Sequence, residues 1–228
     1  DLREVINDIN LIRPAFVLNT GDLVNEGELE DFENRRYYTK AQRLLKEFEV
    51  PHYLVAGNHD LGGWTSTPPS QGTARREWWR FFGWNWLNNP VNEELGYTQD
   101  YSFTYGGLNF IGMEAYDNYD SYQFDIYGES SFIPSQINWL TDVLSQNETA
   151  KANVAFYHCD FKEELDIEQL GIDMALYGHI HQDRGSITIP PYNLATENVC
   201  DGDRAYRIIK VENGVLKPQA TVNAGYDG

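Results

Sequence analysis

Polar residues of metal-binding types stand at four points of the sequence, each just after a short apolar segment. The apolar segments are 15–18, 53–56, 154–157 and 174–177. The polar residues that follow them are Asp22, Asn58-His59-Asp60, His158, and the pair His179 and His181. Carboxylate, amide oxygen and imidazole bind hard to borderline divalent ions such as Mn, Fe or Zn, whereas structural zinc sites are usually rich in thiolate. The pattern therefore predicts a centre for divalent metal ions.

The apolar segments must be strands that bring these residues together. Helical periodicity from Leu2 to Ile9 stops at Pro14 before the first segment, and a second periodic stretch, Glu28–Phe48, precedes the next. Ligands of open α/β sheets bind at the carboxyl ends of the strands, so we expect the four polar points to meet at one edge. Gly21, Gly57 and Gly178 stand beside these points and allow sharp turns there.

The remaining segments complete an α/β pattern. An aromatic-rich loop insertion is expected at about 61–100, with one helix near 75–82. Strands are predicted at 101–105 and 108–115, followed by a helix that begins at Pro134. Strands 153–157 and 173–177 follow, separated by a short helix, and the tail 186–220 reads as strands with a turn at Asn213-Gly214. We therefore predict an α/β fold with helices covering the sheets.

The motifs resemble those of the calcineurin-like metallophosphoesterase family. The matching motifs, in order along nearly the whole chain, are Gly21-Asp22, Gly57-Asn58-His59-Asp60, His158 and Gly178-His179-Ile180-His181. The resemblance implies a single metallophosphoesterase domain over 1–228, built as a four-layer α-β-β-α sandwich. It also implies that the first strand of this fold, with an Asp-x-His motif at its end, is missing from the chain, which would make the domain N-terminally truncated.

The resemblance also implies a role for each residue. Asp22 would bridge two divalent metal ions, Mn, Fe or Zn, and the second site would be completed by Asn58, His158 and His179. His181 would serve the first site, which is incomplete without the Asp-x-His motif. His59 would be the catalytic histidine.

The ligand types indicate a hydrolytic mechanism. Two ions about 4 Å apart hold a hydroxide between them for in-line attack on phosphorus. His59, hydrogen-bonded to Asp60 or another carboxylate, would protonate the leaving alkoxide. The expected activity is a phosphomonoesterase or phosphodiesterase. The alternative is an incomplete or non-catalytic module of the same fold that binds phosphate or metal without turnover.

Composition restricts the partners. A formal charge of -18 disfavours nucleic acid, because unspecific nucleic-acid binding depends on Lys and Arg neutralising phosphates. A small phosphorylated substrate is still compatible with this negative charge, because bound metal ions make the local electrostatic field positive. No apolar run reaches the roughly 18 residues of a membrane helix. The acidic composition and the abundance of Tyr, Asn and Trp favour an extracellular or cell-envelope protein.

Two further features have alternative interpretations. One is an aromatic group, which forms either a satellite core under the loop or a wall that stacks on the substrate. Its members are Trp64, Trp78, Trp79, Phe81, Phe82, Trp84 and Trp86. The other is Cys159, which we interpret as a small buried residue, with a bridge to Cys200 conceivable.

Overall fold

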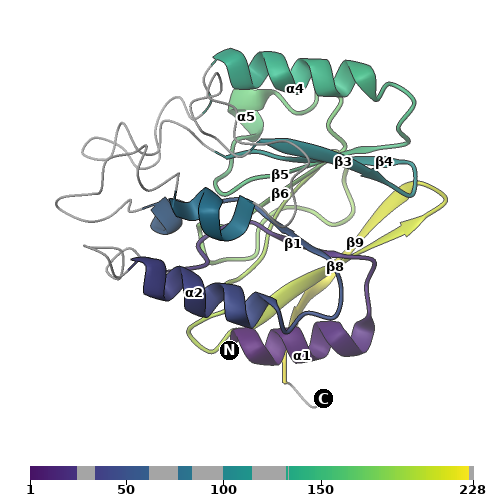
Figure 1. Cartoon of the computed structure of the whole chain (residues 1–228). Helices are drawn as coiled ribbons and strands as arrows, with labels where there is room; N and C mark the ends of the chain where they lie inside the picture. The colour runs from purple at the N-terminus through teal and green to yellow at the C-terminus, as the bar shows by residue number, and fades with distance from the viewer. Residues whose placement is uncertain (25–33, 62–76, 84–99, 115–131, 133, 226–228) are drawn as a thin grey trace.

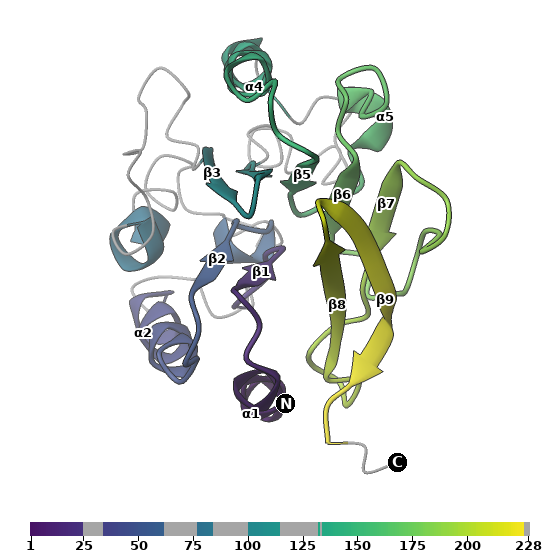
Figure 2. The same ribbon diagram turned by 90° about the vertical axis from the view of Figure 1, so that its right-hand side faces the viewer.

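The fold consists of four layers (Figures 1 and 2). It was obtained as a computed structural model, which describes residues 1–24, 34–61, 77–83, 100–114, 132 and 134–225. Helices α4 (Pro134–Gln146) and α5 (Lys162–Leu165) cover one outer face, and α1 (Leu2–Ile12) and α2 (Asn34–Leu45) cover the other. Strands fill the two layers between them. The expected α-β-β-α sandwich is therefore confirmed.

The two strand layers contain three sheets. The layer beside α4 is one mixed sheet in the order β3-β4-β5-β6-β7, in which only the β3–β4 pair is antiparallel. Its strands are Tyr101–Tyr105, Leu108–Gly112, Asn153–Phe156, Met174–Tyr177 and Tyr192–Ala195. The layer beside α1 holds a parallel pair and an antiparallel pair. The parallel pair is β1 (Val17–Asn19) with β2 (His52–Leu54), and the antiparallel pair is β8 (Ala205–Glu212) with β9 (Val215–Asn223).

Strand β5 shows why the apolar segments are continuous rather than alternating. Successive side chains of a strand point to opposite faces of the sheet. Val154 and Phe156 enter the core between the two strand layers, whereas Ala155 and Tyr157 enter the core under α4. Both faces are therefore buried, which is typical of parallel strands covered by helices.

The outer helices each pack through one apolar stripe. Val5 and Ile9 of α1 pack near Val17 of β1, and α1 ends at Arg13, whose backbone adopts the left-handed conformation. Tyr38 of α2 is fully buried against Trp78 and belongs to the cluster that covers the outer face of β2. These contacts hold the two loops that follow β1 and β2 in place.

Most predicted elements are present, with shifted ends. The helix predicted at 28–48 is described only as α2, because residues 28–33 lie outside the described residues. The helix predicted near 75–82 ends in a π-helical turn, η4 (Trp79–Gly83). Asn213 and Gly214 both have positive φ, 55° and 84°, as the hairpin turn between β8 and β9 requires. No helix in the described part of the chain has the length and apolar character needed to cross a membrane.

The structure decides between some of the alternatives left open for the aromatic group and for the two cysteines. Trp78 and Phe82 are buried with Tyr38, so this part of the aromatic group is a satellite core. Trp64, Trp84 and Trp86 lie outside the described residues. Cys159 is buried and Cys200 is exposed, and both are free thiols, so the conceivable disulfide is absent.

Candidate metal centre

Four potential ligand atoms meet at the carboxyl ends of β1, β2, β5 and β6. His158 Nε2 lies 3.0 Å from Asp22 Oδ2 and 3.0 Å from Asn58 Oδ1. His179 Nδ1 lies 3.1 Å from His158 Nε2 and 3.1 Å from the same Asn58 oxygen. The sequence predicted that the loops after these strands would meet at one edge of the sheet, and for these four residues the prediction is confirmed.

The protonation of His158 makes this group a cation site. His158 Nδ1 lies 2.8 Å from the carbonyl oxygen of Thr20, which can only accept, so Nδ1 carries the proton. In the neutral ring, Nε2 then has a lone pair that faces a carboxylate oxygen and an amide oxygen. A divalent cation satisfies lone pairs that converge in this way, and a backbone carbonyl on the opposite ring nitrogen is the usual way to orient a metal-binding histidine.

Asn58 supports the same conclusion. The residue is fully buried, and its Oδ1 faces both histidine nitrogens. Its Nδ2 is buried without a hydrogen-bond partner among the described residues. The opposite amide orientation would let Nδ2 donate to the two histidine rings, so the orientation in the structure is the one that a metal ligand needs.

The pKa shifts of Asp22 and His179 fit an ionised carboxylate beside a neutral imidazole. Burial raises the pKa of Asp22, but the charge and hydrogen bond of His158 outweigh burial, and the net shift is downward. Burial and the neighbouring His158 lower the pKa of His179 to about 4. Burial alone would lower the pKa of His158, but Asp22 raises it above its usual value.

The loops that carry the ligands need glycine and strained backbone. A Cβ on Gly57 would lie 2.2 Å from Asp22 Oδ1, and one on Gly21 would lie 2.6 Å from the backbone nitrogen of Gly57. Asp22, His179 and His181 have φ of 56°, 65° and 51°, in the left-handed region that non-glycine residues seldom adopt. Such strain costs on the order of 1–3 kcal/mol per residue and concentrates at functional sites.

Asp60 connects the loops after β1 and β2. Its Oδ1 accepts the backbone N–H groups of Leu23 and Val24 at 2.8 and 3.0 Å, and its Oδ2 accepts that of Gly57 at 2.8 Å. Its own carbonyl accepts the Tyr38 hydroxyl. Asp60 is fully buried, so these contacts assign it the structural role of joining the Asp22 loop to the Asn58 loop.

Replacing Asp60 with alanine is expected to lower the free energy of unfolding by about 3 kcal/mol, because one buried and two partly buried N–H donors lose their acceptor. Urea unfolding measures this change. The control is Asp142→Ala, an exposed position on α4, for which we expect a change within about 0.5 kcal/mol. Equal effects of the two substitutions would contradict the structural role of Asp60.

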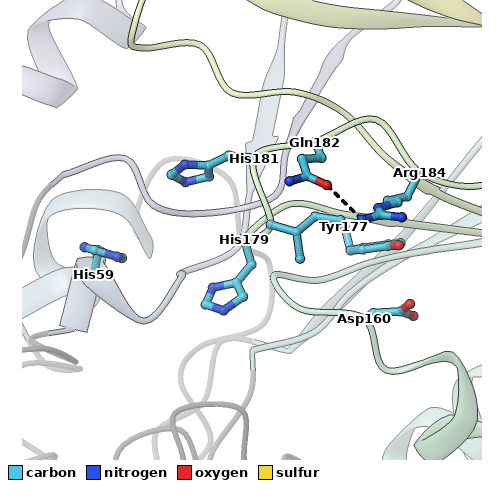
Figure 3. A pocket seen from close by; sticks show the side chains of 8 residues that line it. His59, Asp160, Tyr177, His179, His181, Gln182 and Arg184 are labelled. Atoms are coloured by element: carbon cyan, nitrogen blue, oxygen red, sulfur yellow. Dashed lines mark hydrogen bonds between the residues drawn. The ribbon is translucent and has the colours of Figure 1, made fainter.

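The other predicted site residues lie around a cavity beside the four ligands (Figure 3). The cavity has a volume of about 700 Å³, and His59, His179 and His181 line one side of it. The His59 backbone N–H donates to Asp22 Oδ1 at 3.0 Å, and His59 Nε2 lies 4.0 Å from Asp22 Oδ2. His181 is exposed at this wall of the cavity. The role of His59 in proton transfer and that of His181 as a ligand stay predictions.

Several residues of this region were not found from the sequence. Asp160, Tyr177, Gln182 and Arg184 also line the cavity. All four stand within three residues of a predicted ligand, and this proximity was the available signal. The Cys159 sulfur also lies close, since it and one ring nitrogen each of His158 and His179 are within 4.8 Å of one another. Its side chain packs in the core under α4, as the sequence interpretation proposed.

Solved structures with the same fold include metal-dependent phosphatases. A dimetal phosphatase from Danio rerio aligns with a TM-score of 0.67 at 14% identity, covering 98% of this chain and 88% of its own. The sulfate thiohydrolase SoxB of Thermus thermophilus gives 0.58 at 16% identity, covering 97% of this chain and 41% of its own. A putative 5'-nucleotidase from Staphylococcus aureus gives 0.56 at 13% identity, covering 100% of this chain and 49% of its own. At these identities the likeness shows the fold.

The family is shown by the sequence itself. A search of curated proteins gave no significant match. The family model of calcineurin-like phosphoesterases matches residues 1–183, which include every ligand of the candidate centre. This family implies a dinuclear metal centre and hydrolysis of phosphoric esters. The chain belongs to the calcineurin-like phosphoesterase family.

Proposed function

We propose that this protein hydrolyses a small phosphomonoester or phosphodiester at the metal centre of Asp22, Asn58, His158 and His179. The observation that carries the proposal is the approach of three ligand atoms to within 3.1 Å of the unprotonated His158 Nε2. Divalent ions at such a centre polarise the phosphoryl group and lower the pKa of water. The donor set of one carboxylate, one amide oxygen and two imidazoles suits Mn, Fe or Zn.

The protein's own residues supply the rest of the chemistry. Asp22, which is 16% exposed, would be the residue shared by the two ions, and His181 would serve the first site. His59 is 27% exposed at the cavity wall, where its ring can give a proton to the leaving oxygen. Burial lowers the pKa of His59, and the charge of Asp22 partly opposes this shift.

A non-catalytic module that binds phosphate or metal is the second candidate. The observation that favours it is the asymmetry of the centre. The described residues bring four ligands together for one ion, whereas His181, the remaining candidate for the other, is exposed. Such a module would bind one ion and phosphate, without turnover.

Hydrolysis of p-nitrophenyl phosphate and its bis-ester separates the two candidates. The protein is first freed of metal with a chelator and then assayed with Mn, Fe or Zn added back. We expect metal-dependent release of p-nitrophenol from one or both esters. Binding of metal and phosphate without release from either ester would support the non-catalytic module and overturn the proposed hydrolase.

A further inference from the structure

The cavity beside the metal centre has two chemically different ends (Figure 3). His59, His179 and His181 stand at the metal end. Tyr177, Asp160, Gln182 and Arg184 gather at the opposite end. A volume of about 700 Å³ is within the roughly 300–1,000 Å³ typical of small-molecule sites. The cavity therefore has room for a substrate body that extends well beyond one phosphoryl group.

The backbone of Arg184 is held firmly at the far end. Ala195 at the end of β7 donates its N–H to the Arg184 carbonyl at 3.2 Å, and the two residues form an antiparallel bridge. The next residue, Gly185, has a φ of 88°, and a Cβ there would lie 1.9 Å from the carbonyl oxygen of Asn193. Arg184 thus directly precedes a turn that only glycine permits, and its exposed guanidinium donates to Gln182 Oε1 at 2.8 Å.

The acidic groups near Arg184 have other partners. Asp183 Oδ1 pairs with the Arg207 guanidinium at 2.9 Å and also accepts the Thr221 hydroxyl. Asp160 Oδ1 accepts the Asn193 side-chain amide at 2.9 Å, and Asp160 also accepts a hydrogen bond from Tyr177. Among the described residues that line the cavity, Arg184 is the one with a permanent positive charge. In a chain with a formal charge of -18, this places a single fixed cation opposite the metal ligands.

We propose that Arg184, aligned by Gln182, binds a second anionic group of the substrate, on the side away from the phosphoryl group under attack. The inference rests on the proposed function and names its substrate class: small phosphoesters that carry a second phosphate or a carboxylate. Guanidinium binds both groups through paired N–H donors. Arg184 is three residues from His181, which limits their Cα separation to about 11 Å. The two anionic groups are therefore joined by a compact organic body.

Binding of non-hydrolysable phosphonates tests the inference independently of turnover. The probes are phenylphosphonate, 4-carboxyphenylphosphonate and 1,4-phenylenebisphosphonate, titrated by calorimetry into the Mn-loaded protein. A charge-assisted hydrogen bond is worth roughly 1.5–3 kcal/mol, so we expect each doubly anionic probe to bind at least about tenfold tighter than phenylphosphonate. The carboxylate and phosphonate arms show which anion is preferred.

Substitutions assign the preference to Arg184. Arg184→Gln should abolish the preference and leave phenylphosphonate binding unchanged, whereas Arg184→Lys should keep part of it. The control, Arg13→Gln, removes the same charge from an exposed residue at the end of α1 and should keep the full preference. Phenylphosphonate binding without any preference, or a preference that survives Arg184→Gln, would overturn this inference alone. Failure of all three phosphonates to bind, together with no ester hydrolysis, would overturn the proposed function and this inference with it.

Discussion

Replacing His158 with alanine is expected to weaken binding of the divalent ion by at least about 100-fold and to abolish phosphoester hydrolysis. Removing a group that merely orients a ligand already costs about 10- to 100-fold in metal affinity, and His158 is itself at the centre of the ligand group. Its Nε2 lies within 3.1 Å of each of the other three ligand atoms. Competition with a chelator of known affinity measures the change.

His52 offers a matched control for this substitution. It is half-buried on β2 and its ring lies 5.3 Å from that of Phe48, outside the ligand group. His52→Gln should therefore retain metal affinity and turnover. Metal affinity that is unchanged in His158→Ala, or equally reduced in both variants, would contradict the assignment of His158 as a ligand.

Replacing His59 with alanine is expected to lower kcat by about 100- to 10,000-fold while metal content stays unchanged. The ring lines the cavity, but its Nε2 is 4.0 Å from Asp22 Oδ2, too far for a shared hydrogen bond. The contact to Asp22 that positions this loop comes from the His59 backbone N–H, which alanine keeps. Proton transfer and metal binding should therefore separate in this variant.

Steady-state kinetics with esters of different leaving groups measures this effect. The loss should be largest for a poorly activated alkyl phosphate and smaller for p-nitrophenyl phosphate, whose leaving group needs less help from a proton. A loss of metal in His59→Ala, or an equal loss of kcat for both esters, would contradict a role in protonating the leaving group.

The ligand group could be predicted because it depends on topology alone. An apolar segment such as 154–157 is recognisable as a strand buried on both faces, and parallel strands end at a common edge. The residues directly after those strands must then be neighbours. Strand order therefore brings Asp22, Asn58, His158 and His179 together without any requirement on side-chain contacts.

The role of Asp60 and the far wall of the cavity depend on features that the sequence pattern does not encode. The catalytic role expected of Asp60 beside His59 stays a prediction, but its carboxylate also accepts three backbone N–H groups across two loops. Arg184 reaches the cavity because Gly185 passes closely under Asn193. Both arrangements depend on close backbone packing between different loops. The spacing of apolar residues predicts helices and strands but does not predict such contacts.

Anomalous diffraction from a crystal grown with Mn is the most direct test of the metal centre. We expect an anomalous peak within bonding distance of His158 Nε2, His179 Nδ1, Asn58 Oδ1 and Asp22 Oδ2. Oxygen and nitrogen ligands of divalent ions lie at roughly 2.0–2.2 Å, so the four side chains should separate slightly around the ion. A map with no peak among these atoms, with His158 still hydrogen-bonded to Asp22 and Asn58, would show that these four residues do not bind a metal ion.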